Sequence, residues 1–129
     1  MRYLTNGKEI FVPAGAAIIK EGDEVGEDAV YYVMDGKVRL TRTLEGGYSF
    51  GYAVGKDGVF GVVSTLTSGV HLFSATAETN CQLYVWTKQS YETALSLYIE
   101  FAKLNIQELS HYLRAINQEA EKVWINYVR

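Results

Sequence analysis

Several residue types that mark specialised proteins are scarce in this chain. It holds one cysteine, Cys81, and two histidines, His71 and His111. No disulfide can therefore form within the chain, which is typical of a protein of the reducing cytoplasm. A metal site built from His and Cys ligands lacks donors. The single proline and the 48% apolar content argue against a disordered chain.

An excess of positive charge is also missing, because 12 basic residues stand against 15 acidic ones. Nucleic acid binding by this chain alone would need a concentrated basic face. No apolar run approaches the ~20 residues of a membrane helix, and residues 1–8 lack the apolar core of a signal peptide. No nucleophile-elbow, zinc-protease or phosphate-loop motif is present. We therefore expect a cytoplasmic protein that is not an enzyme, with no cofactor, no metal and no membrane contact.

The chain does contain a series of short strand patterns separated by glycine turns. Asp35-Gly36 lies between two β-branched and aromatic runs, which is the strongest short hairpin signal. The pattern predicts strands at 9–12, 16–20, 30–34, 37–42, 48–54, 70–78 and 82–86. Many short strands with turns at this spacing are typical of an antiparallel sandwich or jelly roll.

The last quarter of the chain carries a different pattern, with apolar residues at alternating steps of three and four. Thr87 is a typical N-cap for a first helix over 88–98, and the long pattern follows at once. A helix with one narrow apolar stripe needs a second helix to cover it. We therefore divide the chain into a β domain, 1–98, and a dimerisation helix, 99–129. The predicted dimer interface consists of Ile106, Leu109, Leu113, Ile116, Ala120, Val123 and Tyr127.

The alternative is that the stripe packs on its own β domain, which we expect in part near Ile99 and Ala102.

Residues 58–77 carry no formal charge and are the stretch that would bind a ligand. Gly61 followed by Val62 to Leu66 predicts a short helix with unpaired backbone N–H groups at its start. His71 is the titratable side chain nearest to it in sequence. The alternative is a tight strand-to-helix corner with His71 facing solvent.

The order of these pieces resembles the effector domain of the CRP/FNR family of transcription regulators. The residues that carry the resemblance are 13–15, Pro-Ala-Gly, 19–23, Ile-Lys-Glu-Gly-Asp, and 30–38, Val-Tyr-Tyr-Val-Met-Asp-Gly-Lys-Val. The resemblance implies a double-stranded β-helix jelly roll, an effector pocket between barrel and long helix, and a homodimer joined by that helix. It also implies a C-terminal winged helix-turn-helix that binds DNA. That domain is absent from this chain, so we expect a fragment rather than an isolated sensor.

The chain departs from the family's cyclic-nucleotide binders. Those carry Gly-Glu-Leu and a later arginine that pairs with the cyclic phosphate, whereas this chain has Gly61-Val62-Val63 and no arginine in the second half of the stretch. An unpaired phosphate in a closed pocket is costly. The resemblance therefore predicts an effector other than a cyclic nucleotide.

The stretch from Val59 to Thr67 looks most similar to the family's 2-oxoglutarate-binding regulators. Aligned without gaps, His71 takes the place of their carboxylate-binding arginine, and Tyr112 and Asn117 take the places of two polar contacts on the long helix. With the charged partners missing, a small carboxylate, a phenol or no ligand at all are the options. The predicted effector-binding residues are Phe60, Gly61, Val62, Val63, His71, Tyr112, Ile116 and Asn117.

The prediction is therefore the sensory and dimerisation domain of a bacterial CRP/FNR-type regulator. The alternatives are a cyclic nucleotide-binding module and, on the shared jelly roll, a cupin-like metalloenzyme. The sequence does not name the effector or the target operons.

Overall fold

The computed structural model describes residues 1–47 and 49–128, without the side chains of 45 and 123–128. Its β part consists of two four-stranded antiparallel sheets with the orders β1-β8-β3-β6 and β2-β7-β4-β5. The strands of the first sheet are β1 (Lys8–Val12), β8 (Cys81–Trp86), β3 (Val30–Asp35) and β6 (Val59–Phe60). Those of the second are β2 (Ala17–Ile19), β7 (Ser74–Ala77), β4 (Val38–Thr43) and β5 (Ser49–Val54). The predicted jelly roll is confirmed.

Most predicted strands lie within a residue or two of their observed bounds. The turn at Gly36 has φ +97° and leads from β3 into β4, as predicted. The hairpin predicted at Asp35-Gly36 is wrong, because β3 pairs with β6 and β8, whereas β4 pairs with β5 and β7 in the other sheet. The strand predicted over 70–78 is wrong in its first half, because the strand is confined to Ser74–Ala77 and Val70 makes only an isolated bridge with Glu24. The two-residue strand β6 was not predicted. Tyr48, the predicted first residue of β5, lies outside the described residues.

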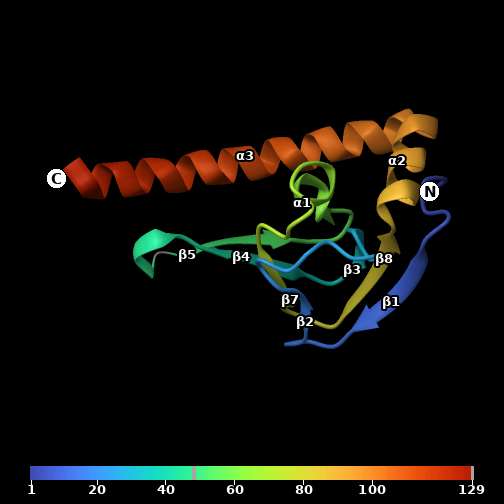
Figure 1. Ribbon diagram of the computed structural model, residues 1–129, viewed down its shortest axis with the longest axis horizontal. Coiled ribbons are helices and arrows are strands. Elements are labelled where there is room, and N and C mark those ends of the chain that lie inside the picture. The colour runs from blue at the N-terminus through green and yellow to red at the C-terminus, as the bar shows by residue number, and fades with distance from the viewer. Residues whose placement is uncertain (48, 129) are drawn as a thin grey trace.

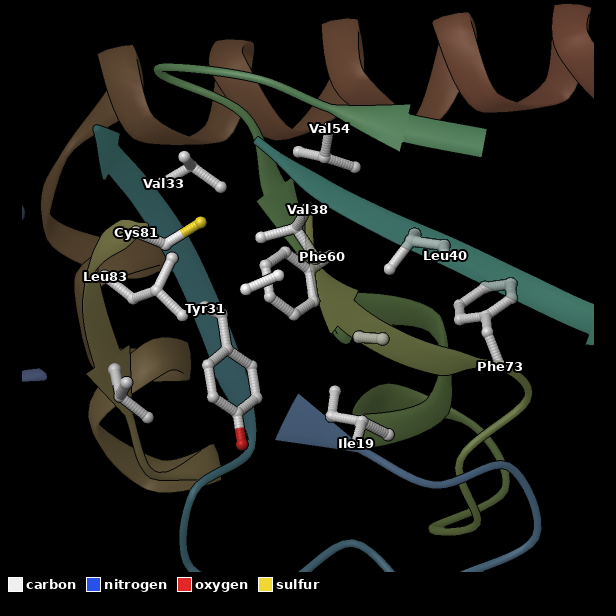
Figure 2. Close-up of a cluster of buried hydrophobic side chains, with 13 residues drawn as sticks. Ile19, Tyr31, Val33, Val38, Leu40, Val54, Phe60, Phe73, Cys81 and Leu83 are labelled. Carbon is white, nitrogen blue, oxygen red and sulfur yellow. The ribbon is translucent and has the colours of Figure 1, made fainter. Parts of the chain in front are cut away.

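The space between the sheets is filled by apolar side chains. Figure 2 shows them converging from both sheets, with Tyr31 and Phe60 at the centre. These two rings stack with their centroids 4.9 Å apart and an angle of 3° between their planes. Val33, Val38 and Leu83 are fully buried beside them. This core holds the two sheets face to face.

A second core covers the outer side of the first sheet. Trp86, on β8, is fully buried, and its indole N–H donates to the carbonyl of Tyr3 at 3.2 Å. Phe101, from the long helix, stacks on Tyr3 with centroids 4.6 Å apart and reaches Trp86 at 5.0 Å. The N-terminal segment and the start of the long helix are thereby fixed to the same face of the sheet.

Three helices complete the fold: α1 (Val62–Leu66), α2 (Lys88–Leu97) and α3 (Ile99–Val128). Thr87 is the N-cap of α2, as predicted, and its hydroxyl accepts the N–H of Ser90 at 3.1 Å. In Figure 1, α3 runs along the top of the β domain, over α1 and the β4–β5 hairpin, and its C-terminal end passes the hairpin tip. The predicted start of α3 at Ile99 is confirmed.

α3 turns one set of side chains toward the β domain and leaves another uncovered. Phe101 and Asn105 are buried, whereas Ile99, Ile106 and Leu113 are 71%, 65% and 59% exposed. The expectation that the stripe packs on its own domain at Ile99 is therefore wrong. Of the predicted interface, Leu109 and Ile116 are half-buried and Ala120 is exposed. The side chains of Val123 and Tyr127 lie outside the described residues.

Candidate effector-binding site

A partly open cavity lies where α3 crosses α1 and the second sheet. It measures about 30 Å³, room for one or two water molecules. The walls are almost wholly apolar or aromatic, and Leu40, Val54, Phe60 and Phe73, which line it, are seen beneath α3 in Figure 2. The full lining is Leu40, Tyr52, Val54, Val59, Phe60, Gly61, Val62, Val63, Phe73, Asn105, Glu108, Leu109 and Tyr112.

The floor at α1 depends on a glycine. Gly61 has φ +90°, and a Cβ there would lie 2.5 Å from the carbonyl oxygen of Ala29. Only glycine meets both conditions without strain. The hydroxyl of Thr65 donates to the same carbonyl at 3.1 Å. This pair of contacts holds α1 against the segment that precedes β3, with Val62 and Val63 turned to the cavity.

Tyr112 of α3 lies over the cavity within a group of aromatic rings. Its ring meets those of Phe73, Tyr52 and Phe50 edge-on, with centroids 5.3, 5.4 and 6.3 Å away. Burial raises the pKa of its phenol, and the positive charge of Arg42 partly opposes that rise. Edge-on aromatic contacts of this kind stabilise by about 0.5–1.5 kcal/mol each. Tyr112 therefore fixes the middle of α3 to β5 and to the segment before β7.

Glu108, one turn earlier on α3, brings a carboxylate to the cavity. The side chain is half-buried, and its Oε2 lies 3.2 Å from the position that a Cβ of Gly58 would take. Burial raises the pKa of this carboxyl group, while the charge of His111 and the backbone N–H of Val59 partly oppose the rise. The carboxylate in turn raises the pKa of the Tyr52 phenol beyond the effect of burial.

Not all predicted site residues meet at the cavity. Phe60, Gly61, Val62, Val63 and Tyr112 line it.

The other three lie outside the lining. Ile116 is half-buried and Asn117 exposed, one turn or more beyond Tyr112 along α3. His71 is only 8% exposed, so the alternative of a solvent-facing histidine is also wrong. Its N–H donates to the carbonyl of Asp23 at 2.9 Å and its own carbonyl accepts the N–H of Gly22 at 2.9 Å. It therefore belongs to the join between the α1–β7 segment and the turn after β2.

The contribution of Asn105 and Glu108 was missed by the sequence analysis. Together with Tyr112 they repeat the three-and-four spacing of the apolar stripe, displaced by one residue. Polar side chains at this spacing mark a second helix face that meets the domain. This signal was available in the sequence, beside the stronger apolar one.

Two negative findings complete the description. Within residues 1–47 and 49–128, no group of three or more His, Cys, Asp or Glu side chains is placed to hold a metal ion. None of the helices in the described part of the chain combines the length and apolar character needed to cross a membrane.

The comparisons with known proteins agree with this architecture. The family model described as "Cyclic nucleotide-binding domain" matches residues 9–98. The catabolite activator protein of Thermus thermophilus is 28% identical, with a TM-score of 0.68 over 98% of this chain and 57% of that one. The N-terminal domain of a transcriptional regulator from Streptomyces coelicolor is 25% identical, with a TM-score of 0.62 over 92% of this chain and 82% of that one.

A third structure, the c-di-GMP-responsive global regulator CLP of Xanthomonas campestris, has a TM-score of 0.81 at 16% identity, over 94% of this chain and 61% of that one. At this identity the likeness concerns the fold alone. No curated protein sequence matches the chain. The chain spans a little over half the length of the Thermus protein.

The jelly roll and the long helix are the architecture of a cyclic nucleotide-binding domain. The chain belongs to the cyclic nucleotide-binding domain family, and its likeness to regulators of the catabolite activator type confirms the CRP/FNR resemblance.

Proposed function

We propose that this chain is the sensory and dimerisation part of a CRP/FNR-type transcriptional regulator. A small effector other than a cyclic nucleotide binds in the cavity, and α3 joins two copies of the chain. Contact with DNA is made through a winged helix-turn-helix domain outside this chain. The observation that carries the proposal is that one helix, α3, both closes the cavity with Tyr112 and presents the uncovered row Ile99, Ile106 and Leu113.

The uncovered row supports dimerisation. Ile99, Ile106 and Leu113 recur every seven residues, as they do along the seam of a two-stranded coiled coil. Each leaves more than half of its surface in water, and covering such a side chain stabilises by roughly 1.5–3 kcal/mol. A second α3 offers the same row in return, because a two-fold interface uses the same patch on both copies.

The cavity supports coupling between ligand and helix. At about 30 Å³ it is far below the roughly 300 Å³ at which small-molecule pockets begin. An effector must therefore displace side chains that fill the site, and Tyr112 is the largest contributed by α3. Leu113 follows at the next position, about 100° further round the helix. A shift of Tyr112 accordingly acts on the dimer row and alters how two copies meet.

A cyclic nucleotide fits this cavity poorly. Its lining contains no Lys, Arg or His side chain, and its one formally charged residue is the acid Glu108. A cyclic phosphate would lose its hydration without gaining a cation. The family match keeps cyclic nucleotide binding as the second candidate. Thermal unfolding with cyclic AMP and cyclic GMP separates the two, because a bound nucleotide at ~100 times its Kd would add about 2.7 kcal/mol of stability. We expect no change.

Light scattering tests the dimer. The double variant Ile106→Glu, Leu113→Glu places two carboxylates in the row and should be monomeric at a concentration where the parent chain is dimeric. The matched control is Gln107→Glu, Gln118→Glu, which adds the same charge at exposed polar positions of α3 and should leave the dimer intact. A monomeric parent chain, or a dimer that survives the first pair of substitutions, contradicts the proposal.

A further inference from the structure

Glu108 introduces the one formal charge into the lining of the cavity described above. Twelve of the thirteen lining residues are uncharged, and most of them are aliphatic or aromatic. A single ionisable group in such surroundings dominates the electrostatic potential felt by a ligand, because few other charges or waters screen it.

The described surroundings leave the carboxylate without a salt-bridge partner. No salt bridge joins Glu108 to any side chain in the part of the chain that the structure describes. The groups that favour its charged form are the backbone N–H of Val59 and the ring of His111, which is exposed. The close approach of Oε2 to Gly58 fixes the group against the turn between β5 and β6.

Building on the proposed effector function, we propose that Glu108 is the specificity-determining residue of the cavity, which takes a small apolar molecule that bears an N–H or O–H donor and no negative charge. The donor binds the Glu108 carboxylate, and the apolar body lies among Val54, Phe60 and Phe73. An anion is rejected because two negative charges in one small, largely apolar site repel each other.

The aromatic rings extend the preference to cations. Tyr52 and Tyr112 meet edge-on, 5.4 Å apart, at the side of the cavity where α3 crosses β5. A cation held over the face of a tyrosine ring gains about 0.5–2 kcal/mol. An ammonium group therefore has two sources of attraction, the rings and the carboxylate, whereas an uncharged alcohol has the hydrogen bond alone.

Three probes with the same ring and different charge test this preference. Benzylamine is a cation at pH 7, benzyl alcohol is a neutral donor and benzoate is an anion. Each is titrated into the isotopically labelled chain and followed by protein NMR, which gives a Kd and identifies the resonances that move. We expect shifts at residues of the cavity lining, with benzylamine and then benzyl alcohol binding at least about tenfold more tightly than benzoate, a difference of ~1.4 kcal/mol.

Two variants assign the preference to Glu108. Glu108→Gln removes the charge and keeps the size, so the amine-to-benzoate ratio should fall to within about threefold. Glu92→Gln makes the same change at an exposed position of α2 and should leave the parent ratio unchanged.

Benzoate binding as tightly as the amine, a ratio that Glu108→Gln does not alter, or no binding of any probe at about 10 mM would each overturn the proposal. None of these outcomes bears on the dimer. Loss of the dimer in turn leaves the probe ratios intact, so the two proposals fail separately.

Discussion

The ring of Tyr112 meets the ring of Phe73 edge-on, with centroids 5.3 Å apart and planes inclined at 82°. One ring belongs to the long helix and the other to the segment that leads into β7. Their contact joins α3, which we propose to form the dimer, to the wall of the proposed effector cavity. The start of α3 is held by Phe101 against Tyr3 and Trp86, and its middle is held over the β domain by the ring contacts of Tyr112.

Replacing Tyr112 tests this link directly. Tyr112→Ala removes three edge-on ring contacts and should lower the free energy of unfolding by about 2 kcal/mol. Tyr112→Phe keeps the ring and should lower it by less than about 1 kcal/mol. Urea unfolding measures both, and hydrogen exchange of α3 amides should rise in the alanine variant alone. Equal losses in the two variants would show that the hydroxyl, and not the ring packing, holds the helix.

Gly61 provides a second prediction, at the floor of the cavity. In Gly61→Ala the new Cβ lies 2.5 Å from the carbonyl oxygen of Ala29. The alanine must also adopt the φ of +90° that Gly61 has. The matched control is Gly15→Ala, where φ is +87° and nothing lies within 4 Å. Thermal unfolding should show that the control lowers the free energy of unfolding by ~1 kcal/mol, from backbone strain alone. Gly61→Ala should lower it by at least about 1 kcal/mol more. Similar costs would mean that the contact with Ala29 relaxes freely.

A buried polar pair joins α2 to α3 and gives a third prediction. The hydroxyl of Tyr91 donates to Asn105 Oδ1 at 2.6 Å, and Asn105 Nδ2 donates to the carbonyl of Phe101 at 2.8 Å. Tyr91→Phe leaves Asn105 Oδ1 buried without a hydrogen-bond partner, so it should lower the free energy of unfolding by about 1–3 kcal/mol. Asn105→Leu should cost a similar amount.

The double variant should lower the free energy of unfolding by less than the sum of the two single effects, because the residues share one interaction. A double-mutant cycle by urea unfolding measures the difference. Simple additivity would contradict the pairing.

His71 predicts how stability depends on pH. Burial lowers the pKa of His71 below its ordinary 6.5, against a smaller opposing effect of Asp23. Between the folded-state pKa and 6.5, the unfolded chain binds a proton that the folded chain does not. The contribution of His71 to the free energy of unfolding is therefore full above pH 6.5 and is lost as the pH falls through the lower, folded-state pKa.

Urea unfolding over this range, compared with His71→Gln, measures the effect, and the variant should show a smaller loss on acidification. The NMR titration of the His71 ring should give a midpoint below 6.5. A midpoint above that value would reverse the sign and contradict the burial of the ring.

Local signals were enough to predict the main elements. The turn at Asp35-Gly36 needs a residue with positive φ, which Gly36 supplies, and the N-cap at Thr87 depends on a hydroxyl next to the helix start. Both features act within a few residues, so the sequence contains them in full. The long helix was recognised because its apolar period persists over its whole length.

Long-range contacts decided the parts that the sequence analysis missed. Residues 70–73 look like a strand, yet the hydroxyl of Ser64 accepts the N–H of Leu72 and the carbonyl of Asp23 accepts that of His71. Together with the isolated bridge between Val70 and Glu24, these contacts hold the segment to α1 and to the turn after β2 without forming a continuous strand. Glu108 was missed for a related reason. The stronger apolar stripe indicated one contact face of α3 and left unassigned the neighbouring face, which carries Glu108. Which face meets the β domain depends on tertiary packing.

The length of α3 gives small movements at the cavity a large reach. Beyond Tyr112 the helix continues to Val128, a distance of about 24 Å at 1.5 Å per residue. With Tyr112 as the fulcrum, a tilt of some ten degrees carries the far end through about 4 Å, if the helix stays rigid. A tilt that moves the atoms next to Tyr112 by a fraction of an ångström thus displaces the C-terminal end of α3 by several ångströms.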